Sequence, residues 1–341
     1  MIKGFQQTSR ACGKPSVKGL HKPILKITIK SLSQVPSVLQ TSSSMQFFKY
    51  HALGNDYLVL ESDDIQRQLT PEVIFQICAP HFGIGADGIL VRQPDPEPGR
   101  FEVQIFNSGG SEAEKSGNGL RIFARYLWDL KLVGENPFQV NTQGGTVTCQ
   151  LSQQGKTVAV DMGHVTFNSY DIPVTGPPRE VLQETMNVSG RKFEFSAASV
   201  GNPHCVIPVD EVSEEETRTF GPLIETEARF PNLTNVQFMQ VLNRNNIRIE
   251  IWERGVGYTF ASGTSSCAAA AVARRLDLCD QEVTVAMPGG ELEVVVDDNY
   301  AVHMTGPVVK VAEGELCNEI YECDALLYQP HLQREEETSA K

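Results

Sequence analysis

The sequence predicts an α/β protein that consists of two similar halves in tandem. Three observations lead to this prediction. The length of 341 residues suits two domains of roughly 100–200 residues each. Landmarks recur along the chain at an offset of about 146 residues, and strand-like runs alternate with helix-like segments around each landmark. An internal repeat indicates the architecture more firmly than a single motif does, so the prediction rests mainly on this constant offset.

Two short motifs mark strands in each copy. Leu53-Gly54-Asn55 is repeated as Val200-Gly201-Asn202, and each is followed by a strand-like run, over 57–60 in the first copy and over 205–207 in the second. Each copy closes with a Gly-Gly step and two further strand-like runs, at Gly144-Gly145 with 158–162 and at Gly289-Gly290 with 301–304.

A match to GxGxxG at Gly83–Gly88 does not have the surroundings of a nucleotide site. The nucleotide-binding form of this motif needs a strand before it and a helix after it. Here the order is reversed, because Thr70-Pro71 predicts a helix that runs through Ile77, and the residues 89–91 are strand-like. We therefore predict a tight turn and reject nucleotide binding.

The other landmark places a serine at the start of a helix in each half. Ser116-Gly117-Asn118 is repeated as Ser262-Gly263-Thr264. Helix-like segments follow, with apolar residues at i, i+3, i+4 and i+7 over 120–127 and with many alanines over 267–275. We predict that both serines are N-caps. The two helix starts are prepared anion sites, and they would face each other if the halves pack about a pseudo-two-fold axis.

The residues upstream of the two serines are also repeated. Nine residues before each serine a polar side chain follows an aromatic one, in Phe106-Asn107 and in Trp252-Glu253. The simplest interpretation is that both serines are only helix caps. The repeated upstream polar residues and glycines favour a site shared between the halves.

The composition limits the classes of function. The chain has 29 basic and 42 acidic residues, a net charge of −13, which argues against a general nucleic-acid binder. The longest run of small apolar residues, 268–273, is far shorter than the ~20 residues of a membrane helix. The eight cysteines form no CxxC pair, which is typical of a reduced compartment. We therefore expect a cytoplasmic protein with neither a nucleic-acid nor a membrane partner.

The residues 1–44 differ from the rest of the chain. They contain seven basic residues, eight Ser and three Thr, and no acidic residue. This composition is typical of an organelle transit peptide, which would direct the protein to the plastid stroma. The alternative is that the natural chain starts at Met45, which opens a strand-like run. Both interpretations predict a disordered extension, and a solvated polar tail is expected over 326–341.

Metal and cofactor motifs are missing from the sequence. None of the patterns GxxxxGK[ST], GxSxG or HExxH occurs, and the seven histidines do not cluster at metal-ligand spacing. We therefore expect neither a metal nor a cofactor.

Taken together, the motifs resemble those of the diaminopimelate epimerases. The resemblance runs from about residue 45 to about residue 315 and rests on Gly54-Asn55-Asp56, Phe106-Asn107-Ser-Gly-Gly-Ser-Glu112, Gly117-Asn118-Gly119, Gly201-Asn202-Pro203-His204, Thr234-Asn235-Val236 and Trp252-Glu253-Arg254-Gly255. It implies a cofactor-independent amino-acid epimerase of lysine biosynthesis. Such an enzyme converts LL-2,6-diaminopimelate to meso-diaminopimelate by two-sided proton transfer at the α-carbon.

We expect the fold to consist of two α/β (α+β) halves, each a mixed sheet around a central helix, with the active-site cleft between them. The first half is expected over 45–163 and the second over 164–306. The residues 307–325 are expected to return to the first half, because no later strand remains for them to pair with in the second. A homodimer is implied by the resemblance alone.

The resemblance assigns the proton transfers to one residue from each half. The family uses two cysteines, and the matching positions here are Ser116 and Ser262. His204 and Glu253 match the residues that assist proton removal. A hydroxyl is a much weaker acid than a thiol and needs an adjacent base, which these two side chains can supply. We interpret Cys267 as a packing residue, and a role as a substitute thiol is the weaker alternative.

The resemblance also implies a substrate-binding set of amides, an ion pair and helix-start residues: Asn55, Asn107, Gly117, Asn118, Asn202, Asn235, Glu253, Arg254, Gly263 and Thr264. Asparagine both donates and accepts hydrogen bonds, which suits a zwitterion. Arg254 can bind a carboxylate through two parallel hydrogen bonds. Each residue taken singly is explained as a turn former or a surface ion pair, whereas the constellation at repeat-related positions favours a site.

Two alternatives stay open because serine replaces both cysteines. The chain is then a related isomerase or dehydratase that acts on another amino acid, or a non-catalytic homologue that only binds an amino acid. Serines engineered in place of cysteines are a further explanation of the same two positions.

Overall fold

The computed structural model describes residues 45–321, all of which belong to one compact unit of the chain. The expectations for the basic extension (1–44), for the end of the return segment (322–325) and for the polar tail (326–341) lie outside the described residues.

The first half of the described chain is mainly strands with two α-helices. Its elements are β1 (Met45–Ala52), β2 (Asn55–Glu61), η1 (Ser62–Asp64), α1 (Pro71–Cys78), β3 (Gly88–Glu97), β4 (Arg100–Asn107), α2 (Gly117–Asp129), β5 (Phe138–Thr142), β6 (Gly145–Ser152), η2 (Gln153–Gly155) and β7 (Thr157–His164).

The second half repeats this arrangement with an additional strand, β8, at its start and a short strand, β13, beside β12. Its elements are β8 (Glu184–Val188), β9 (Arg191–Ser199), β10 (Pro203–Pro208), α3 (Glu214–Glu225), β11 (Asn235–Asn243), β12 (Asn246–Glu253), β13 (Gly257–Thr259), α4 (Gly263–Arg275), β14 (Glu282–Met287), β15 (Gly290–Val296) and β16 (Ala301–Pro307). The chain then continues into β17 (Val309–Leu316) and η3 (Asn318–Tyr321).

The strands of the two halves pair in the same order. From β1 to β7 the successive pairings are antiparallel, parallel, antiparallel, parallel, antiparallel and antiparallel. The same order recurs from β9 to β16, where β13 is an extra strand beside β12. The predicted duplication into two halves with mixed sheets is confirmed.

Two pairings connect segments that are distant in the sequence. β7 pairs with β16 in antiparallel fashion, so the strands of the two halves form one continuous hydrogen-bonded sheet. The sequence analysis did not predict this connection. β17 pairs with β1, with Met45 opposite Leu316, and thereby adds the last described strand to the sheet of the first half.

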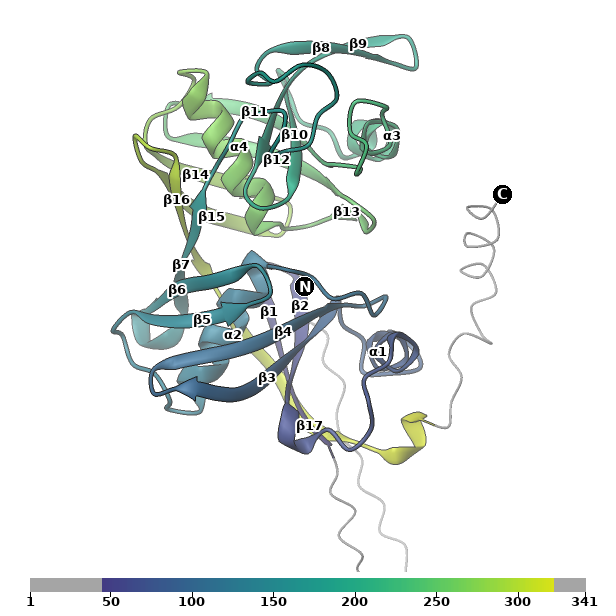
Figure 1. Ribbon diagram of the computed structural model, residues 1–341, viewed down its shortest axis with the longest axis vertical. Coiled ribbons are helices and arrows are strands. Elements are labelled where there is room, and N and C mark those ends of the chain that lie inside the picture. Colours follow the sequence, from purple (N-terminus) through teal and green to yellow (C-terminus); the bar gives the residue numbers. More distant parts are fainter. Residues whose placement is uncertain (1–44, 322–341) are drawn as a thin grey trace, which may run out of the picture. The chain divides into compact units, whose positions relative to one another are not determined.

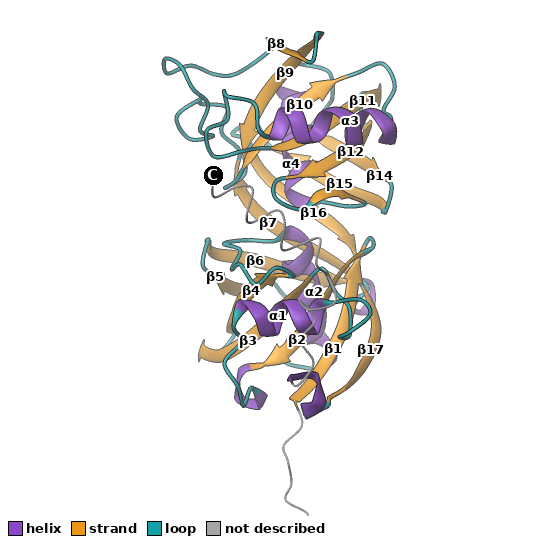
Figure 2. Ribbon diagram, turned by 90° about the vertical axis from the view of Figure 1, so that its right-hand side faces the viewer, coloured by secondary structure: helices purple, strands orange, loops and turns teal. Residues whose placement is uncertain are grey.

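A central helix lies inside the curved sheet of each half, as Figures 1 and 2 show for α2 and α4. In α2 the predicted apolar face is fully buried, including Leu120, Phe123 and Leu127. In α4 every residue from Ala268 to Ala273 is fully buried, because methyl-sized side chains let the strands pack closely on all sides of the helix. Both helices belong to one buried apolar cluster that spans the two halves.

The shorter helix α1 forms as the sequence predicts. The Thr70 side chain accepts a hydrogen bond from the backbone N–H of Val73, and Pro71 occupies the first turn. The residues 83–87 then turn into β3, which begins at Gly88, so the GxGxxG match is a turn before a strand. Among the described residues, no helix is both long and apolar enough to cross a membrane.

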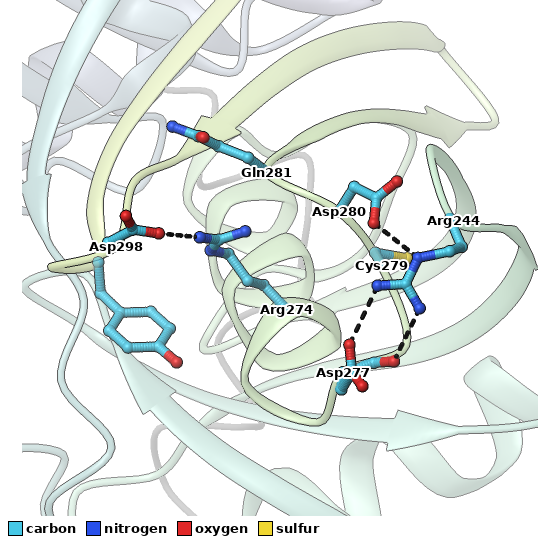
Figure 3. A pocket seen from close by; sticks show the side chains of 8 residues that line it. Arg244, Arg274, Asp277, Cys279, Asp280, Gln281 and Asp298 are labelled. Atoms are coloured by element: carbon cyan, nitrogen blue, oxygen red, sulfur yellow. Dashed lines mark hydrogen bonds and ion pairs between the residues drawn. The ribbon is translucent and has the colours of Figure 1, made fainter.

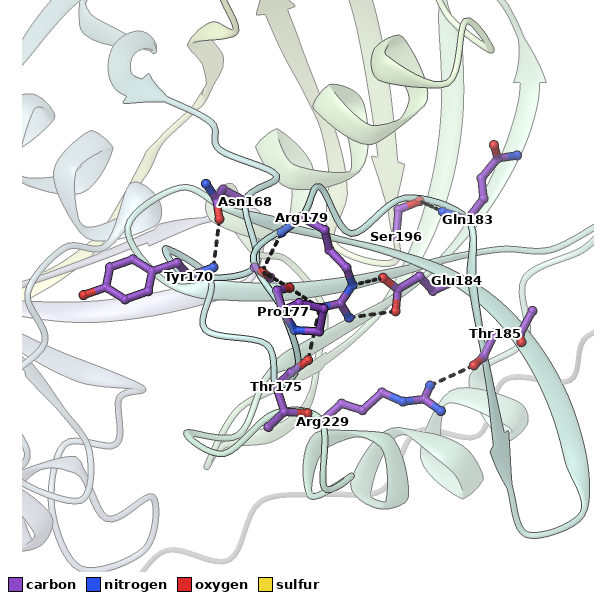
Figure 4. A network of polar contacts seen from close by, with 11 residues as sticks. Asn168, Tyr170, Thr175, Pro177, Arg179, Gln183, Glu184, Thr185, Ser196 and Arg229 are labelled. Carbon is purple, nitrogen blue, oxygen red and sulfur yellow. Dashed lines mark hydrogen bonds and ion pairs between the residues drawn. The ribbon is translucent and has the colours of Figure 1, made fainter.

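The long connection between β7 and β8, residues 165–183, is held together by Arg179 (Figure 4). The Arg179 guanidinium donates to both carboxylate oxygens of Glu184, at 2.6 and 3.0 Å, and to the backbone carbonyls of Thr175 and Pro177. Together with backbone hydrogen bonds such as that from Thr166 N–H to the carbonyl of Ser199, this planar cation holds a segment that has no helix or strand of its own.

Candidate active site

Two helix N-termini meet at the junction of the halves. A Cβ atom added to Gly117, the first residue of α2, would lie 3.3 Å from the Cα of Gly263, the first residue of α4. It would also lie 2.6 Å from the Cε of Met304. Only glycine permits this approach of the two backbones. The positive ends of both helix dipoles therefore adjoin, as the repeated motifs predicted, and they form a site that suits an anion.

Both serines are N-caps, as predicted. Ser116 Oγ accepts a hydrogen bond from the backbone N–H of Gly119 at 3.1 Å, and Ser262 Oγ accepts one from Ser265 at 3.4 Å. The two caps have equivalent backbone conformations, with φ and ψ of −136° and 118° at Ser116 and −143° and 122° at Ser262. The duplicated backbone therefore presents one hydroxyl from each half.

The hydroxyl of Ser116 has a phenol as its neighbour. Tyr57 in β2 lies with its hydroxyl 3.3 Å from Ser116 Oγ, and the tyrosine is almost fully buried. Burial raises the pKa of the Tyr57 phenol well above its ordinary value, and the nearby carboxylates of Glu253 and Asp87 raise it further. The phenol is therefore neutral over the physiological range and keeps its proton for a hydrogen bond.

The hydroxyl of Ser262 has a carboxylate as its neighbour. Burial raises the pKa of the Glu253 carboxyl above its ordinary value, and a hydrogen bond with the Ser262 side chain opposes this change. The charge of Asp87 raises the pKa of Glu253 as well. Thr264 Oγ1 lies 3.4 Å from Ser262 Oγ on the first turn of α4. A carboxylate with a raised pKa is a stronger base than one exposed to water.

Asn118 connects the two halves through its side-chain amide. Its Nδ2 donates to Asn55 Oδ1 at 2.9 Å and to the backbone carbonyl of Ala261, next to Ser262, at 3.1 Å. Its Oδ1 accepts from Arg121 at 2.8 Å. Asn55 in turn donates to Asp87 at 2.8 Å. These contacts fix the orientation of both amides.

Arg121 is an unexpected member of this network, because its guanidinium is fully buried. Burial lowers the pKa of Arg121 to about 10. Besides Asn118 it contacts the sulfur of Met304 at 3.5 Å. The cation therefore lies directly behind the two helix starts and adds to their positive potential.

His204 and Asn202 form a pair at the start of β10. His204 is fully buried, and its Nε2 lies 2.8 Å from Asn202 Oδ1. Burial, with a smaller contribution from the charge of Arg254, lowers the pKa of His204 to about 3. The imidazole is therefore neutral and is a much weaker base than an exposed histidine.

Asn235 and Arg254 form the next group of the predicted set. Asn235 Nδ2 donates to the carbonyl of Pro203 at 2.8 Å, and its Oδ1 accepts from the backbone N–H of Arg254 at 3.0 Å. The exposed Arg254 guanidinium donates to the carbonyl of Asn232 at 3.2 Å. Asn235 thus holds β10 and the end of β12 together, and Arg254 keeps a charged face toward solvent.

Asn107 and Cys267 lie at the margins of the site. Asn107 Nδ2 donates to Ser111 Oγ at 3.0 Å, within the loop that leads to α2. Cys267 is fully buried in α4, and burial raises its pKa to about 12. These features agree with its interpretation as a packing residue. No group of three or more His, Cys, Asp and Glu that could hold a metal occurs in residues 45–321.

Tyr57, Asp87 and Arg121 were not among the residues that sequence reasoning selected. One signal was present for Tyr57: the offset of 147 that relates Asn55 to Asn202 also relates Tyr57 to His204. Asp87 lies in the GxGxxG turn, for which the sequence analysis rejected nucleotide binding and considered no other role. Arg121 lies in the predicted helix over 120–127, of which only the apolar face was considered.

A separate hollow of about 330 Å³ lies at the C-terminal end of α4, the end opposite Ser262 (Figure 3). Arg244 pairs there with Asp277 and Asp280, and Arg274 pairs with Asp298. Because each guanidinium already has a carboxylate partner, this hollow is a set of surface ion pairs rather than a prepared anion site.

Solved structures share this two-half fold. A hydroxyproline epimerase from Agrobacterium vitis superposes with a TM-score of 0.60 at 13% identity and covers 81% of this chain and 93% of its own. A predicted epimerase from Pseudomonas aeruginosa superposes with a TM-score of 0.58 at 17% identity and covers 81% and 100%. At these identities the likeness shows that the chain shares the two-half fold of these structures.

The sequence comparisons are more specific. The model of the family described as "Diaminopimelate epimerase" matches residues 47–168 and 196–311. "Diaminopimelate epimerase 2" of a Nostoc species is 54% identical over 283 residues, which are 83% of this chain and 99% of the relative. "Diaminopimelate epimerase" of a Synechococcus species is 40% identical over 280 residues, 80% and 98%. The chain belongs to the diaminopimelate epimerase family and is an isomerase.

Proposed function

We propose that the protein is a diaminopimelate epimerase of lysine biosynthesis that converts LL-2,6-diaminopimelate to meso-diaminopimelate. The observation that carries this proposal is the contact between the starts of α2 and α4 at Gly117 and Gly263, each capped by a hydroxyl. The 54% identity to the Nostoc relative over nearly its whole length supports the substrate.

The reaction needs an anion site beside the α-carbon. When the α-proton leaves, negative charge spreads from the α-carbon into the neighbouring carboxylate. The backbone N–H groups at the two helix starts, with the buried Arg121 cation behind them, stabilise this charge where it develops. These fixed positive groups supply an electron sink from the chain's own residues.

The reaction also needs an acid and a base on opposite faces of the α-carbon. Ser116 and Ser262 occupy these two positions, one from each half. Ser262 lies beside Glu253, whose carboxylate removes the hydroxyl proton while Ser262 Oγ takes the α-proton. His204 acts less as a base than as the partner that orients Asn202, because its pKa is low and its Nε2 is already bonded.

The amide residues position the zwitterionic substrate. Asn55, Asn118 and Asn202 offer acceptors and donors around the reacting centre, and Asn235 holds the strand ends that carry His204 and Glu253. Arg254 is exposed, so its guanidinium can bind the distal carboxylate of the substrate. Asn107, Gly117, Gly263, Thr264 and Glu253 complete the proposed set.

Deuterium exchange tests this proposal. Purified protein incubated with LL-diaminopimelate in deuterated water should incorporate deuterium at the α-carbon and form the meso isomer. Absence of exchange at high enzyme concentration would refute it. The alternatives, a related isomerase or dehydratase and a non-catalytic binding homologue, are not favoured, because the relatives are diaminopimelate epimerases.

We further propose a cytoplasmic homodimer, with the plastid stroma as the location if residues 1–44 are a transit peptide. Sedimentation equilibrium tests the dimer, and N-terminal sequencing of the natural protein distinguishes a chain that begins at Met1 from one that begins near Met45.

A further inference from the structure

We propose that Asp87 binds the ammonium group on the reacting α-carbon of the substrate through its carboxylate oxygen Oδ1. This inference rests on the proposed epimerase function. That function places positive groups beside the two carboxylates of the substrate, and Asp87 supplies the opposite charge for an ammonium.

One oxygen of the Asp87 carboxylate is used inside the protein, and the other is free. Oδ2 accepts a hydrogen bond from Asn55 Nδ2 at 2.8 Å and another from the backbone N–H of Asp56 at 3.0 Å. Among residues 45–321, no donor contacts Oδ1 and no basic side chain forms an ion pair with Asp87. Because an ionised carboxylate only accepts hydrogen bonds and an ammonium only donates them, the free oxygen suits an ammonium.

The neighbouring carboxylate of Asp56 differs from Asp87, because both of its oxygens have partners. Its Oδ2 pairs with Lys49 Nζ at 2.7 Å, and its Oδ1 accepts from the backbone N–H of Asp87 at 3.0 Å. Lys49 also donates to the carbonyl of Gly85 at 2.5 Å. The lysine therefore neutralises Asp56 and holds the turn before β3, and the charge of Asp87 is left for a ligand.

The backbone of Asp87 is held from two sides. Its N–H donates to Asp56, and its carbonyl accepts from the N–H of Ser108 at 3.0 Å, in the loop that leads to α2. The two donors on Oδ2 fix the carboxylate as well. A charged acceptor whose position is set before binding loses little side-chain freedom when its ligand arrives.

Hydrogen bonds connect Asp87 to the start of α4. Its partner Asn55 accepts from Asn118 Nδ2, and the same Nδ2 donates to the carbonyl of Ala261, the residue before Ser262. Asp87 is thus two side chains away from the backbone that carries the serine of the second half.

Strand pairing connects Asp87 to the start of α2. The next residue, Gly88, lies opposite Tyr57 in the register of β2 and β3, and the Tyr57 hydroxyl lies 3.3 Å from Ser116 Oγ. Because Asp87 is close to both helix starts, we assign to it the ammonium of the reacting carbon. The distal end of the substrate stays with Arg254.

The surroundings of Asp87 strengthen its attraction for a cation. The residue is exposed, and yet neighbouring protein raises the pKa of its carboxyl above the ordinary value by partial burial, as does the charge of Asp56. A carboxylate that solvent reaches but that protein partly desolvates attracts a cation more strongly than a carboxylate on an open surface does.

An ammonium bound at Asp87 assists the reaction without a proton transfer of its own. The opposite charge favours the protonated form of the amine. A protonated amine withdraws electron density from the α-carbon and makes its C–H bond more acidic. Asp87 therefore orients the α-carbon at the helix starts and keeps the substrate in the form that loses its α-proton most readily.

The test is Asp87→Asn, which keeps the contacts inside the protein. Both of these contacts are donors, so the amide oxygen takes the place of Oδ2 and the NH2 group takes the place of Oδ1. Calorimetry should show a Kd for LL-diaminopimelate that is raised about 10- to 100-fold, the effect of one hydrogen bond between charged groups. Asp95→Asn is the matched control, because the exposed Asp95 of the same half already pairs with Arg92, and its Kd should equal that of the wild type.

Pimelate separates recognition of the ammonium from damage to the site. It has the carbon chain and both carboxylates of diaminopimelate and no ammonium group. Pimelate should therefore bind Asp87→Asn at least as tightly as it binds the wild type. An unchanged Kd for LL-diaminopimelate in the variant, or an equal loss of affinity for pimelate, would overturn the assignment.

A substrate with one ammonium identifies which end Asp87 binds. In L-2-aminopimelate the single ammonium must lie at the reacting carbon whenever the α-proton exchanges. Its exchange in deuterated water should slow in Asp87→Asn as much as that of LL-diaminopimelate, and an unaltered rate would overturn the assignment to the reacting carbon.

Binding and turnover fail separately in these experiments. A wild-type protein that binds LL-diaminopimelate without any deuterium exchange would refute the epimerase proposal alone. Normal exchange in the wild type, together with an unchanged Kd in Asp87→Asn, would overturn the role of Asp87 alone.

Discussion

The surroundings of Ser116 and of Ser262 differ although their backbones repeat each other. Both serines cap a helix that begins with glycine, at nearly equal φ and ψ. Ser116 is half-buried beside the Tyr57 phenol, whereas Ser262 is only 2% exposed and lies beside the Glu253 carboxylate. The repeated backbone thus brings the two helix starts together at Gly117 and Gly263, whereas the side chains around the two serines differ between the halves.

The largest expected effect on the rate of epimerisation comes from a substitution of Glu253 in the second half. Glu253→Gln keeps the size of the side chain and removes the base, so we expect epimerisation to fall by about 10³-fold. Because burial raises the pKa of Glu253, the activity of the wild-type protein should decline as the pH falls through a value above the ordinary carboxyl range. The measurement is the initial rate of meso-isomer formation between pH 5 and 9, and an unaltered rate in the variant would contradict the assignment of the base.

The variant Gly263→Ala tests whether the close contact between the starts of α2 and α4 is needed for activity. In Gly263→Ala the added Cβ would meet Met304 Sδ at 2.9 Å and Gly117 Cα at 3.2 Å. Separation of the two helix starts should lower kcat by about 100-fold, the cost of a displacement of about 1 Å at a reacting centre. Gly134→Ala is the control, because a Cβ there meets no atom within 4 Å. Equal kcat values in the two variants would show that the contact is not needed.

A gain of activity is expected when thiols are placed at the two caps. Ser116→Cys combined with Ser262→Cys should raise the rate of epimerisation by about tenfold or more, because a thiol ionises far more readily than a hydroxyl at a helix start. Ser213→Cys is the matched control, since Ser213 caps α3 in the same manner and accepts from Glu216. A rate that does not rise would indicate that the serines do not limit the reaction.

The smallest expected effect is a pH dependence of stability from His204. The folded pKa of about 3 lies below the ordinary value of 6.5, so the unfolded chain binds more protons between these values. Stability contributed by the neutral imidazole is complete above pH 6.5 and falls below it by about 1.4 kcal/mol per pH unit. Urea unfolding at pH 7, 6 and 5 should show a shallower slope in His204→Gln than in the wild type and in the exposed control His81→Gln. Equal slopes in His204→Gln and the wild type would mean that the loss of stability at low pH comes from other groups.

Local rules made the two caps predictable. Ser-Gly before a periodic apolar segment predicts an N-cap at Ser116, and the alanine run predicts the helix after Ser262, because both depend on neighbours within one turn. The offset between the copies then predicted two similar halves, each with a mixed sheet around a helix, but not which strands pair. The contact of Gly117 with Gly263 followed from the symmetry of the repeat rather than from either segment alone.

The residues that were missed depend on contacts across the fold. Tyr57 reaches Ser116 because β2 runs beside the start of α2, and strand-like sequence gives no sign of where one phenol will lie. Arg121 departs from the usual exposure of arginine, so the helix pattern could not reveal its contact with Asn118. The segment 165–183, fixed by Arg179, overlaps residues 169–195 that the family model leaves unmatched and has no counterpart in the first half.

The pairing of β17 with β1 has a consequence for the order of synthesis. Met45 is made early and lies opposite Leu316, which is made last among the strands, with the whole second half between them in the chain. The sheet of the first half therefore stays one strand short while the second half is translated. A ribosome that stops before Val309 releases a chain without β17, whose β1 has a free edge that is open to pairing with another such chain.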